Sequence, residues 1–137
     1  INYTDGPFKD YVKEICGGAG ADVIYDPVGG DVFDESLRCI NWDGRLLVIG
    51  FTSNRIPKAP ANLALLKNCS IVGVFWGAWT ERHPDLHRKN MDIMFQWLRE
   101  EKLRPNISHH FPLEEVPAAL NVLVERKVVG KAVITVD

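Results

Sequence analysis

The chain has 137 residues, of which 46% are hydrophobic and 25% charged, and it carries a formal net charge of −2 with a pI near 6.1. This composition is typical of a globular domain and argues against intrinsic disorder. The chain has no basic field, so neither nucleic acid nor an anionic membrane surface is expected as a partner. No apolar run reaches the roughly 18 to 20 residues that cross a bilayer, and we expect a cytoplasmic protein.

Cysteine and histidine patterns predict no metal site. Cys16, Cys39 and Cys69 are odd in number and far apart, which favours reduced thiols over a disulfide framework, and the chain has no C-x-x-C pair. His83 and His87 share a helical face, where a neighbouring carboxylate would complete a metal site. A solvated helix start is the favoured interpretation, so no metal ligand is assigned.

The first elements in chain order are a helix and a strand. A helix is predicted over residues 7–15, with Thr4 or Asp5 as its N-cap and proline in its first turn. A buried strand follows over residues 21–28 and runs into the glycine pair 29–30. Ligands of open parallel sheets bind outside the carboxyl ends of the strands, so we expect a binding site at this turn.

The middle of the chain continues with β-α-β patterning. Asp31 is predicted to cap a second helix, and residues 41–44 are predicted to form a turn. Continuous apolar runs then indicate strands of the parallel, buried type, and Gly73 inside one of them is compatible with close approach of another backbone. The expected elements are a strand at 45–50, a helix at 61–68 and a strand at 70–77.

The last third of the chain changes character. An amphipathic helix is predicted from Pro84 onward, with an apolar stripe that ends at Leu98. Alternating residues then indicate an edge strand, followed by a helix that starts near two glutamates and a final strand. These last elements are expected at 107–113, from 114 onward, and at 132–136.

Taken together, these segments resemble the C-terminal part of a medium-chain dehydrogenase/reductase, and they are most similar to its zinc-free NADPH:quinone oxidoreductase branch. The likeness runs over essentially the whole chain, in the family's order and spacing. The segments that carry it are Ala21 to Gly30, Gly44 to Phe51, Ala61-Asn62-Leu63, Phe111 to Glu115 and Gly130-Lys131.

The resemblance implies an α/β fold: the second half of a Rossmann-type parallel sheet flanked by helices, with C-terminal strands and a helix that return to a GroES-like domain. Residues 1–105 would be a partial dinucleotide-binding domain that lacks its first β-α-β unit. Residues 106–137 would be the segment that returns to the substrate domain.

The resemblance also implies contacts with a nicotinamide cofactor, placed only where this sequence matches the family. They comprise a residue at the adenosine end, a turn beside the ribose and pyrophosphate, two segments whose backbone meets the nicotinamide carboxamide, and a basic residue. In that order they are Tyr3; Val28, Gly29 and Gly30; Val48, Ile49, Gly50 and Phe51 with Val74, Phe75 and Trp76; and Lys131. No catalytic side chain is expected, because hydride transfer belongs to the cofactor.

The implied function is reduction of a quinone or an activated double bond by NADPH, with NADH as a possible cofactor, while the isolated chain is expected to be inactive. One alternative is a zinc-dependent alcohol dehydrogenase of the same superfamily, and another is a dimerisation module without activity. A homodimer is expected through the apolar stretch Ser70 to Gly77, since an uncovered apolar edge strand invites pairing.

Overall fold

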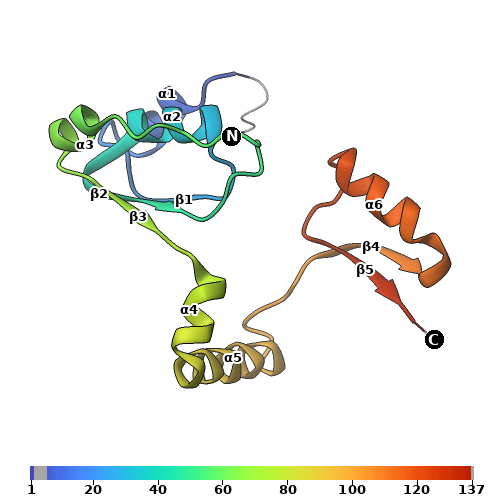
Figure 1. The fold of residues 1–137 in the computed structure, drawn as a ribbon. Helices are drawn as coiled ribbons and strands as arrows, with labels where there is room; N and C mark the ends of the chain where they lie inside the picture. Colours follow the sequence, from blue (N-terminus) through green and yellow to red (C-terminus); the bar gives the residue numbers. More distant parts are fainter. Residues whose placement is uncertain (2–5, 137) are drawn as a thin grey trace. The chain divides into compact units, whose positions relative to one another are not determined.

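The structure is a computed structural model of the chain, and it describes residue 1 and residues 6–136 (Figure 1). The chain forms two compact units, Ile1–Trp79 and Thr80–Asp137, and each is described by itself. The predicted division after residue 105 concerns which parent domain each segment belongs to, and it stays a prediction.

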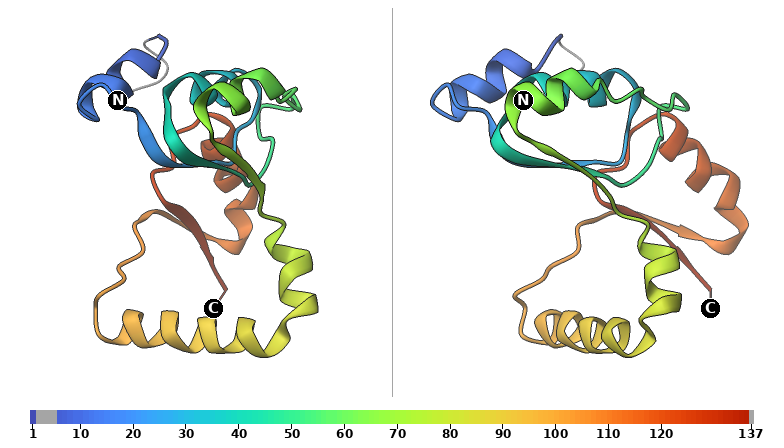
Figure 2. Two further views of the ribbon diagram at one scale, coloured as in Figure 1. Left: turned by 90° about the vertical axis from the view of Figure 1, so that its left-hand side faces the viewer. Right: turned by 60° about the vertical axis from the view of Figure 1, so that its left-hand side comes forward.

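The first unit is a three-stranded parallel sheet with helices on one of its faces (Figure 1, Figure 2). The strands lie in the order β1-β2-β3, which is the order of the second half of a doubly wound sheet. The predicted α/β fold is therefore confirmed. The elements are α1 (Lys9–Ile15), β1 (Ala21–Asp26), α2 (Gly30–Cys39), β2 (Ile40–Val48), α3 (Ala61–Lys67) and β3 (Ser70–Gly73).

The core of this unit lies between the sheet and α2. Phe33 and Leu37 are one helical turn apart and pack with Ile40 and Leu46, and all four side chains are buried. Fully burying an apolar side chain of this size contributes about 1.5–3 kcal/mol, so this cluster fixes α2 on the sheet. Partly buried residues of β1, β2, α3 and β3, together with the residue just before β3, surround it, namely Ile24, Val48, Leu63, Ile71 and Cys69.

The register brings the carboxyl ends of the three strands to one edge. Asp26 is the partner of Val48, and Val48 is the partner of Gly73. The segments that follow these residues therefore leave the sheet side by side, as predicted from the apolar runs.

The start of α1 differs from the expectation of a local cap. The helix begins at Lys9, and the predicted caps Thr4 and Asp5 lie outside the described residues. A carboxylate oxygen of Glu35, on α2, instead accepts hydrogen bonds from the N–H groups of Phe8 at 2.7 Å and Lys9 at 3.3 Å.

Two boundaries around β1 and α2 also need correction. The predicted strand 21–28 ends at Asp26, because the chain turns at Pro27. The second helix is capped by Gly29, while Asp31 lies in its first turn. The positive φ of 68° at Gly29 suits glycine and not a capping aspartate.

The predicted turn at 41–44 lies inside β2 as a four-residue excursion from the ladder. Ala21 pairs with Ile40, but Val23 already pairs with Arg45, so residues 41–44 have no counterpart on β1. The left-handed backbone of Asp43, with φ of 60°, turns the chain within this excursion.

The strand predicted at 70–77 is shorter than expected. The strand β3 ends at Gly73, and α4 (Trp76–Arg82) begins three residues later. The N–H of Val74 donates to Val48 at 3.0 Å as the last bond toward the sheet, and the N–H of Trp79 already donates to Phe75 as in a helix. An apolar run alone does not distinguish a strand from a helix start.

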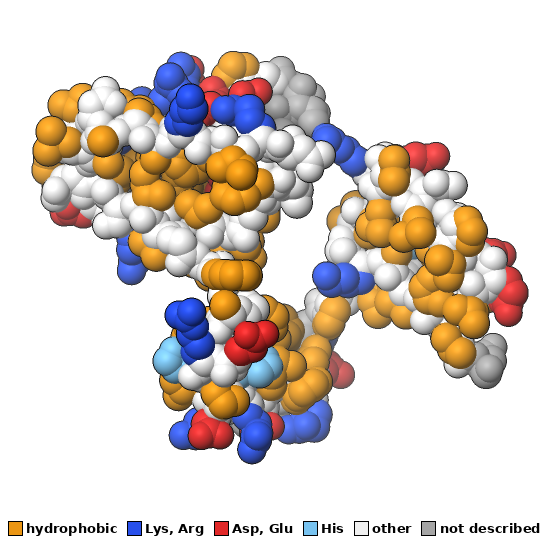
Figure 3. All heavy atoms as spheres, viewed as in Figure 1, with side chains coloured by type: hydrophobic (Ala, Val, Ile, Leu, Met, Phe, Trp, Pro, Cys, Tyr) orange, Lys and Arg blue, Asp and Glu red, His pale blue; other side chains and the backbone are white. Residues whose placement is uncertain are grey.

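The second unit holds α5 and a small parallel sheet. Proline lies in the first turn of α5, as predicted, and β4 pairs in parallel with β5. The predicted edge strand and final strand are confirmed with bounds shifted by one residue. Large apolar side chains stay exposed on both units (Figure 3). The elements are α5 (Pro84–Arg99), β4 (Ile107–Pro112), η2 (Leu113–Glu115), α6 (Val116–Val124) and β5 (Lys131–Thr135).

Candidate cofactor-binding site

A groove of about 490 Å³ opens at the carboxyl ends of β2 and β3. It brings together two of the predicted cofactor segments, which are far apart in the sequence. All of its lining residues are apolar or glycine, so its walls offer backbone groups and hydrocarbon surface. They are Val48, Ile49, Gly50, Phe51, Gly73, Val74 and Phe75.

Backbone hydrogen bonds hold both sides of the groove in place. The N–H of Ile49 donates to the carbonyl of Asp26 at 2.9 Å, and the N–H of Val74 donates to the carbonyl of Val48 at 3.0 Å. These bonds continue the ladder one residue past β2 and β3. The backbone on each side of the groove is therefore anchored to the sheet at Ile49 and Val74.

Gly73 is a groove residue that the sequence-based assignment left out. A Cβ at this position would meet no atom within 4 Å, so the absent side chain leaves open space against the backbone. Its signal in the sequence was a glycine within a β-branched run, which marks close approach of a ligand or another backbone.

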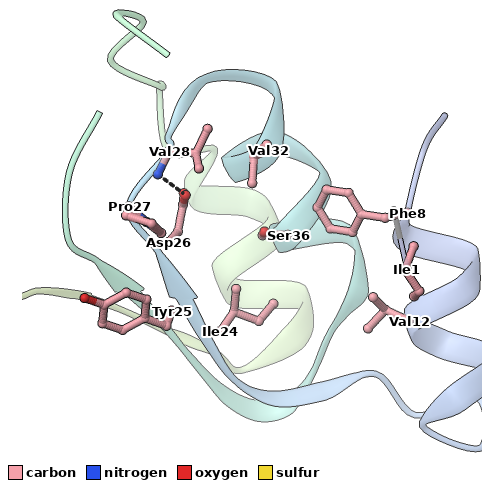
Figure 4. A pocket seen from close by; sticks show the side chains of 10 residues that line it. All are labelled: Ile1, Phe8, Val12, Ile24, Tyr25, Asp26, Pro27, Val28, Val32 and Ser36. Atoms are coloured by element: carbon pink, nitrogen blue, oxygen red, sulfur yellow. Dashed lines mark hydrogen bonds between the residues drawn. The ribbon is translucent and has the colours of Figure 1, made fainter. Parts of the chain in front are cut away.

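The turn after β1, which was predicted to lie beside the ribose and pyrophosphate, is held together by Asp26. The Oδ1 atom of Asp26 accepts hydrogen bonds from the N–H groups of Val28 and Gly29, each at 2.9 Å, while Asp26 itself is 2% exposed. Its other oxygen, Oδ2, has no hydrogen-bond partner among the described residues. Asp26 also borders a hollow of about 300 Å³ between β1, α1 and α2, where Ile24 and Val32 form part of the apolar wall (Figure 4).

The loop after β2 lies across this turn. The N–H of Thr52 donates to Pro27 at 3.2 Å, that of Ser53 donates to Val28 at 3.0 Å, and that of Gly30 donates to Arg55 at 3.0 Å. The N–H groups of residues 28–30 are thus all engaged within the chain. A pyrophosphate beside this turn would need its hydrogen-bond donors from elsewhere, whereas a ribose needs no such cradle.

Charges at this corner are concentrated on Arg55 and two carboxylates of α2. The Nη2 atom of Arg55 lies 2.8 Å from Asp31 Oδ1 and 2.5 Å from Asp34 Oδ2. The hydrogen bond to Asp34 is the main cause that raises the pKa of Arg55 above its usual value. The guanidinium is therefore already neutralised by the protein, which again disfavours a phosphate at this corner.

Three further residues were predicted to contact the cofactor. Trp76 begins α4 and is not a lining residue. Lys131 begins β5 in the second unit, where its N–H donates to Asn106 at 2.9 Å. Tyr3 lies outside the described residues. The cofactor contacts of these three residues stay predictions.

The described residues contain neither a candidate metal cluster nor a candidate membrane span. Across residue 1 and residues 6–136, histidine, cysteine, aspartate and glutamate form no cluster of three that would bind a metal ion. In the same part of the chain, no helix combines the length and the apolarity needed to span a membrane.

A parallel α/β sheet with a groove at the carboxyl ends of its strands is the arrangement in which open α/β folds bind their ligands. Residues 1–134 match the family model of zinc-binding dehydrogenases, and the chain belongs to this family, within the medium-chain dehydrogenase/reductase superfamily. The resemblance seen in the sequence is confirmed.

Among sequence relatives, the chain is 45% identical over 135 residues to a quinone oxidoreductase-like protein 2 homolog of Nematostella vectensis, covering 98% of this chain and 37% of that protein. It is 30% identical over 147 residues to an NADPH-dependent curcumin reductase of Escherichia coli, covering 99% and 41%. The chain thus spans about two fifths of the length of the relatives it matches.

Solved structures agree with this assignment. A probable oxidoreductase from Mycobacterium abscessus has a TM-score of 0.74 and 34% identity, covering 93% of this chain and 37% of that one. A mycobacterial protein complexed with NADPH has a TM-score of 0.84 at 24% identity, covering 98% and 41%, and this likeness concerns the fold alone.

Proposed function

We propose that the intact protein is an oxidoreductase that uses NADPH to reduce a quinone or an activated double bond, and that this chain supplies the nicotinamide side of its cofactor site. The observation that carries the proposal is the groove at the ends of β2 and β3, with apolar walls and two glycines. The names of the relatives, which include quinone oxidoreductase-like proteins and an NADPH-dependent reductase, support the same reaction class.

In this proposal, the bound cofactor supplies the hydride, and the chain orients the ring and excludes water. The backbone along Val48 to Phe51 and at Val74 and Phe75 pairs with the carboxamide, because Gly50 and Gly73 leave it accessible. Residues 28–30 lie beside the ribose. Tyr3, Trp76 and Lys131 are proposed as further contacts, and no catalytic side chain is assigned.

The groove also favours a particular kind of acceptor. Phe51 and Phe75 line it, with exposed fractions of 39% and 81%, and none of the lining side chains is charged. Aromatic rings without a counter-charge suit an uncharged planar molecule better than an anion. This observation favours a quinone within the proposed substrate range.

Steady-state assays of the full-length protein test the proposal. NADPH and NADH are each offered with a naphthoquinone and with an enoyl thioester. We expect turnover with NADPH and faster reduction of the quinone, with NADH as the weaker cofactor. Absence of turnover with every combination would contradict the proposal.

A zinc-dependent alcohol dehydrogenase is the alternative activity within the family. Metal analysis of the full-length protein distinguishes the alcohol dehydrogenase from the quinone reductase. Bound zinc in stoichiometric amount, together with alcohol oxidation, would favour the alcohol dehydrogenase. The names of the relatives, a quinone oxidoreductase-like protein and an NADPH-dependent curcumin reductase, favour the reductase over the alcohol dehydrogenase.

We also propose a homodimer formed through residues 70–77. The strand β3 lies at one edge of the sheet, Val72 is 38% exposed, and Phe75 follows it with its side chain exposed. A lysine on an edge strand opposes pairing with a second copy. Sedimentation should therefore show more monomer for Val72→Lys than for the matched Val129→Lys, at an exposed position of the second unit. An unchanged dimer in Val72→Lys would exclude this interface.

A cytoplasmic location completes the proposal. The three cysteines are free in the structure, as suits a reducing compartment. Fractionation of cells that express the full-length protein checks the location, and recovery in an organelle fraction would contradict it.

A further inference from the structure

We propose that Arg55 is a positioning residue for the nicotinamide groove. Its ion pairs with Asp31 and Asp34 fix residues 51–55, here called the strap, and thereby hold Phe51 in the groove wall. This inference rests on the proposed function.

The ion pairs join the strap to α2. A single guanidinium nitrogen of Arg55 reaches both carboxylates, at 2.8 Å and 2.5 Å. Asp31 and Asp34 are three residues apart on the helix and so share one face. The two carboxylates thus define one position for the guanidinium at the start of α2.

Contacts of the strap with Gly29 and Gly30 connect the guanidinium position to the groove wall. The carbonyl of Arg55 accepts the N–H of Gly30, and the hydroxyl of Ser53 packs 2.7 Å from where a Cβ of Gly30 would lie. At the other end of the strap, Phe51 Cδ1 is 2.8 Å from where a Cβ of Gly29 would lie. The ring of Phe51 therefore rests on the Gly29 backbone and at the same time lines the groove.

Backbone hydrogen bonds at Thr52, Ser53 and Arg55 also tie the strap to the turn after β1, but no buried side chain does so, because residues 51–55 are all exposed. Segments with exposed backbone hydrogen bonds and little apolar burial open locally more often than the core does. The link from Arg55 to α2 is therefore well placed to limit such opening, although exposed ion pairs add little to global stability.

Arg55 could instead attract the cofactor directly through its charge, and the variant Asp34→Asn separates the two roles. If Arg55 acts as a free cation, removing the Asp34 charge should tighten NADPH binding. If Arg55 acts through the strap, Asp34→Asn should weaken binding in the same direction as Arg55→Met. The double variant should then be no weaker than Arg55→Met alone.

The experiment uses the full-length protein. For Arg55→Met we expect the KM for NADPH to rise roughly threefold to tenfold, with partial recovery in Arg55→Lys and with a melting temperature within about 2 °C of wild type. The matched control is Arg104→Met, which removes another exposed ion pair, 2.6 Å from Glu101 in the second unit. Equal KM values for Arg55→Met and Arg104→Met, or tighter binding in Asp34→Asn, would overturn the inference.

A second measurement keeps the strap testable if the wild-type protein shows no turnover with NADPH, in which case the proposed function fails. Hydrogen exchange of the Gly30, Thr52 and Ser53 amides reports the strap directly, because all three donate within it or to its neighbours. Exchange should be faster in Arg55→Met and Asp34→Asn than in Arg104→Met. Identical exchange in all three variants would refute the role of Arg55.

Discussion

The Oδ1 atom of Asp26 accepts the N–H of Gly29 at 2.9 Å and so connects the end of β1 to the residue that caps α2. The same atom accepts the N–H of Val28, so one buried carboxylate fixes the whole turn. This turn in turn supports Phe51, which lines the groove. The packing of this part of the groove wall therefore depends on a side chain that does not itself line the groove.

Replacing Asp26 tests this relationship. Asp26→Ala leaves two N–H groups without an acceptor and should lower the free energy of unfolding by about 1–3 kcal/mol. Asp26→Asn retains an acceptor oxygen, so its free energy of unfolding should fall by less. Urea unfolding measures both, with Asp92→Ala on the exposed side of α5 as the control. Equal stability of Asp26→Ala and Asp92→Ala would contradict the assigned role.

A side chain at Gly29 should disturb both the turn and the groove. Its φ of 68° and ψ of −155° are disfavoured for other residues, and a Cβ would lie 2.8 Å from Phe51 Cδ1. We expect Gly29→Ala to destabilise the protein by about 1–3 kcal/mol and to weaken NADPH binding. Gly17 has a similar φ of 63°, but a Cβ there would have no neighbour within 4 Å. Gly17→Ala should therefore lower the free energy of unfolding without weakening NADPH binding. Unfolding curves and NADPH titrations of both variants test this prediction, and equal NADPH affinity of the two variants would contradict it.

The opposite behaviour is expected at Gly73, where a side chain meets no protein atom within 4 Å but occupies the groove. Gly73→Val should keep or raise stability, since valine favours strands, while its NADPH affinity falls at least tenfold, equivalent to about 1.4 kcal/mol. The control Ser70→Val lies on the same strand, outside the groove. A fluorescence titration that gives the two variants equal affinity would mean that the cofactor does not use this groove.

Stability at alkaline pH should depend on Cys39. Burial, with a smaller contribution from Glu35, raises the pKa of the Cys39 thiol above its ordinary value. The contribution of a group with a raised pKa is complete below the unfolded pKa, about 8.5 for cysteine, and is lost as the pH rises toward the folded pKa. The stability difference between wild type and Cys39→Ala should therefore shrink between about pH 8 and pH 10. Urea unfolding across this range checks it, with the exposed Cys16→Ala as control. A pH-independent difference would refute it.

The sheet could be predicted from the sequence because its signals are local. Continuous apolar runs ending in glycine mark β1, β2 and β3 in their correct order. The two segments that line the groove were placed by the resemblance to the family. The predicted end of β3 was wrong, because the apolar residues Val74 to Trp76 fit a strand and a helix start equally well.

Other features depend on residues that are distant in the sequence. Glu35 caps α1 from 26 and 27 residues away, and Arg55 reaches Asp34 from 21 residues away. No local sequence pattern predicts either contact, because charged residues at these positions are equally typical of an ordinary solvent-exposed surface. Gly73 did have a local signal, but a glycine in a strand marks a ligand site, a bulge or a bend equally well.

The excursion at residues 41–44 and the groove lie at opposite ends of the same strands. The excursion interrupts the ladder near Ala21, at the amino ends of the strands, while the groove lies at their carboxyl ends. A substitution in this segment would therefore act at the end of the sheet opposite the groove, where Asn41 and Asp43 form hydrogen bonds with Asp22 and Asn68. Trp42, 61% exposed within it, is a natural attachment point for a fluorescent reporter or an affinity tag.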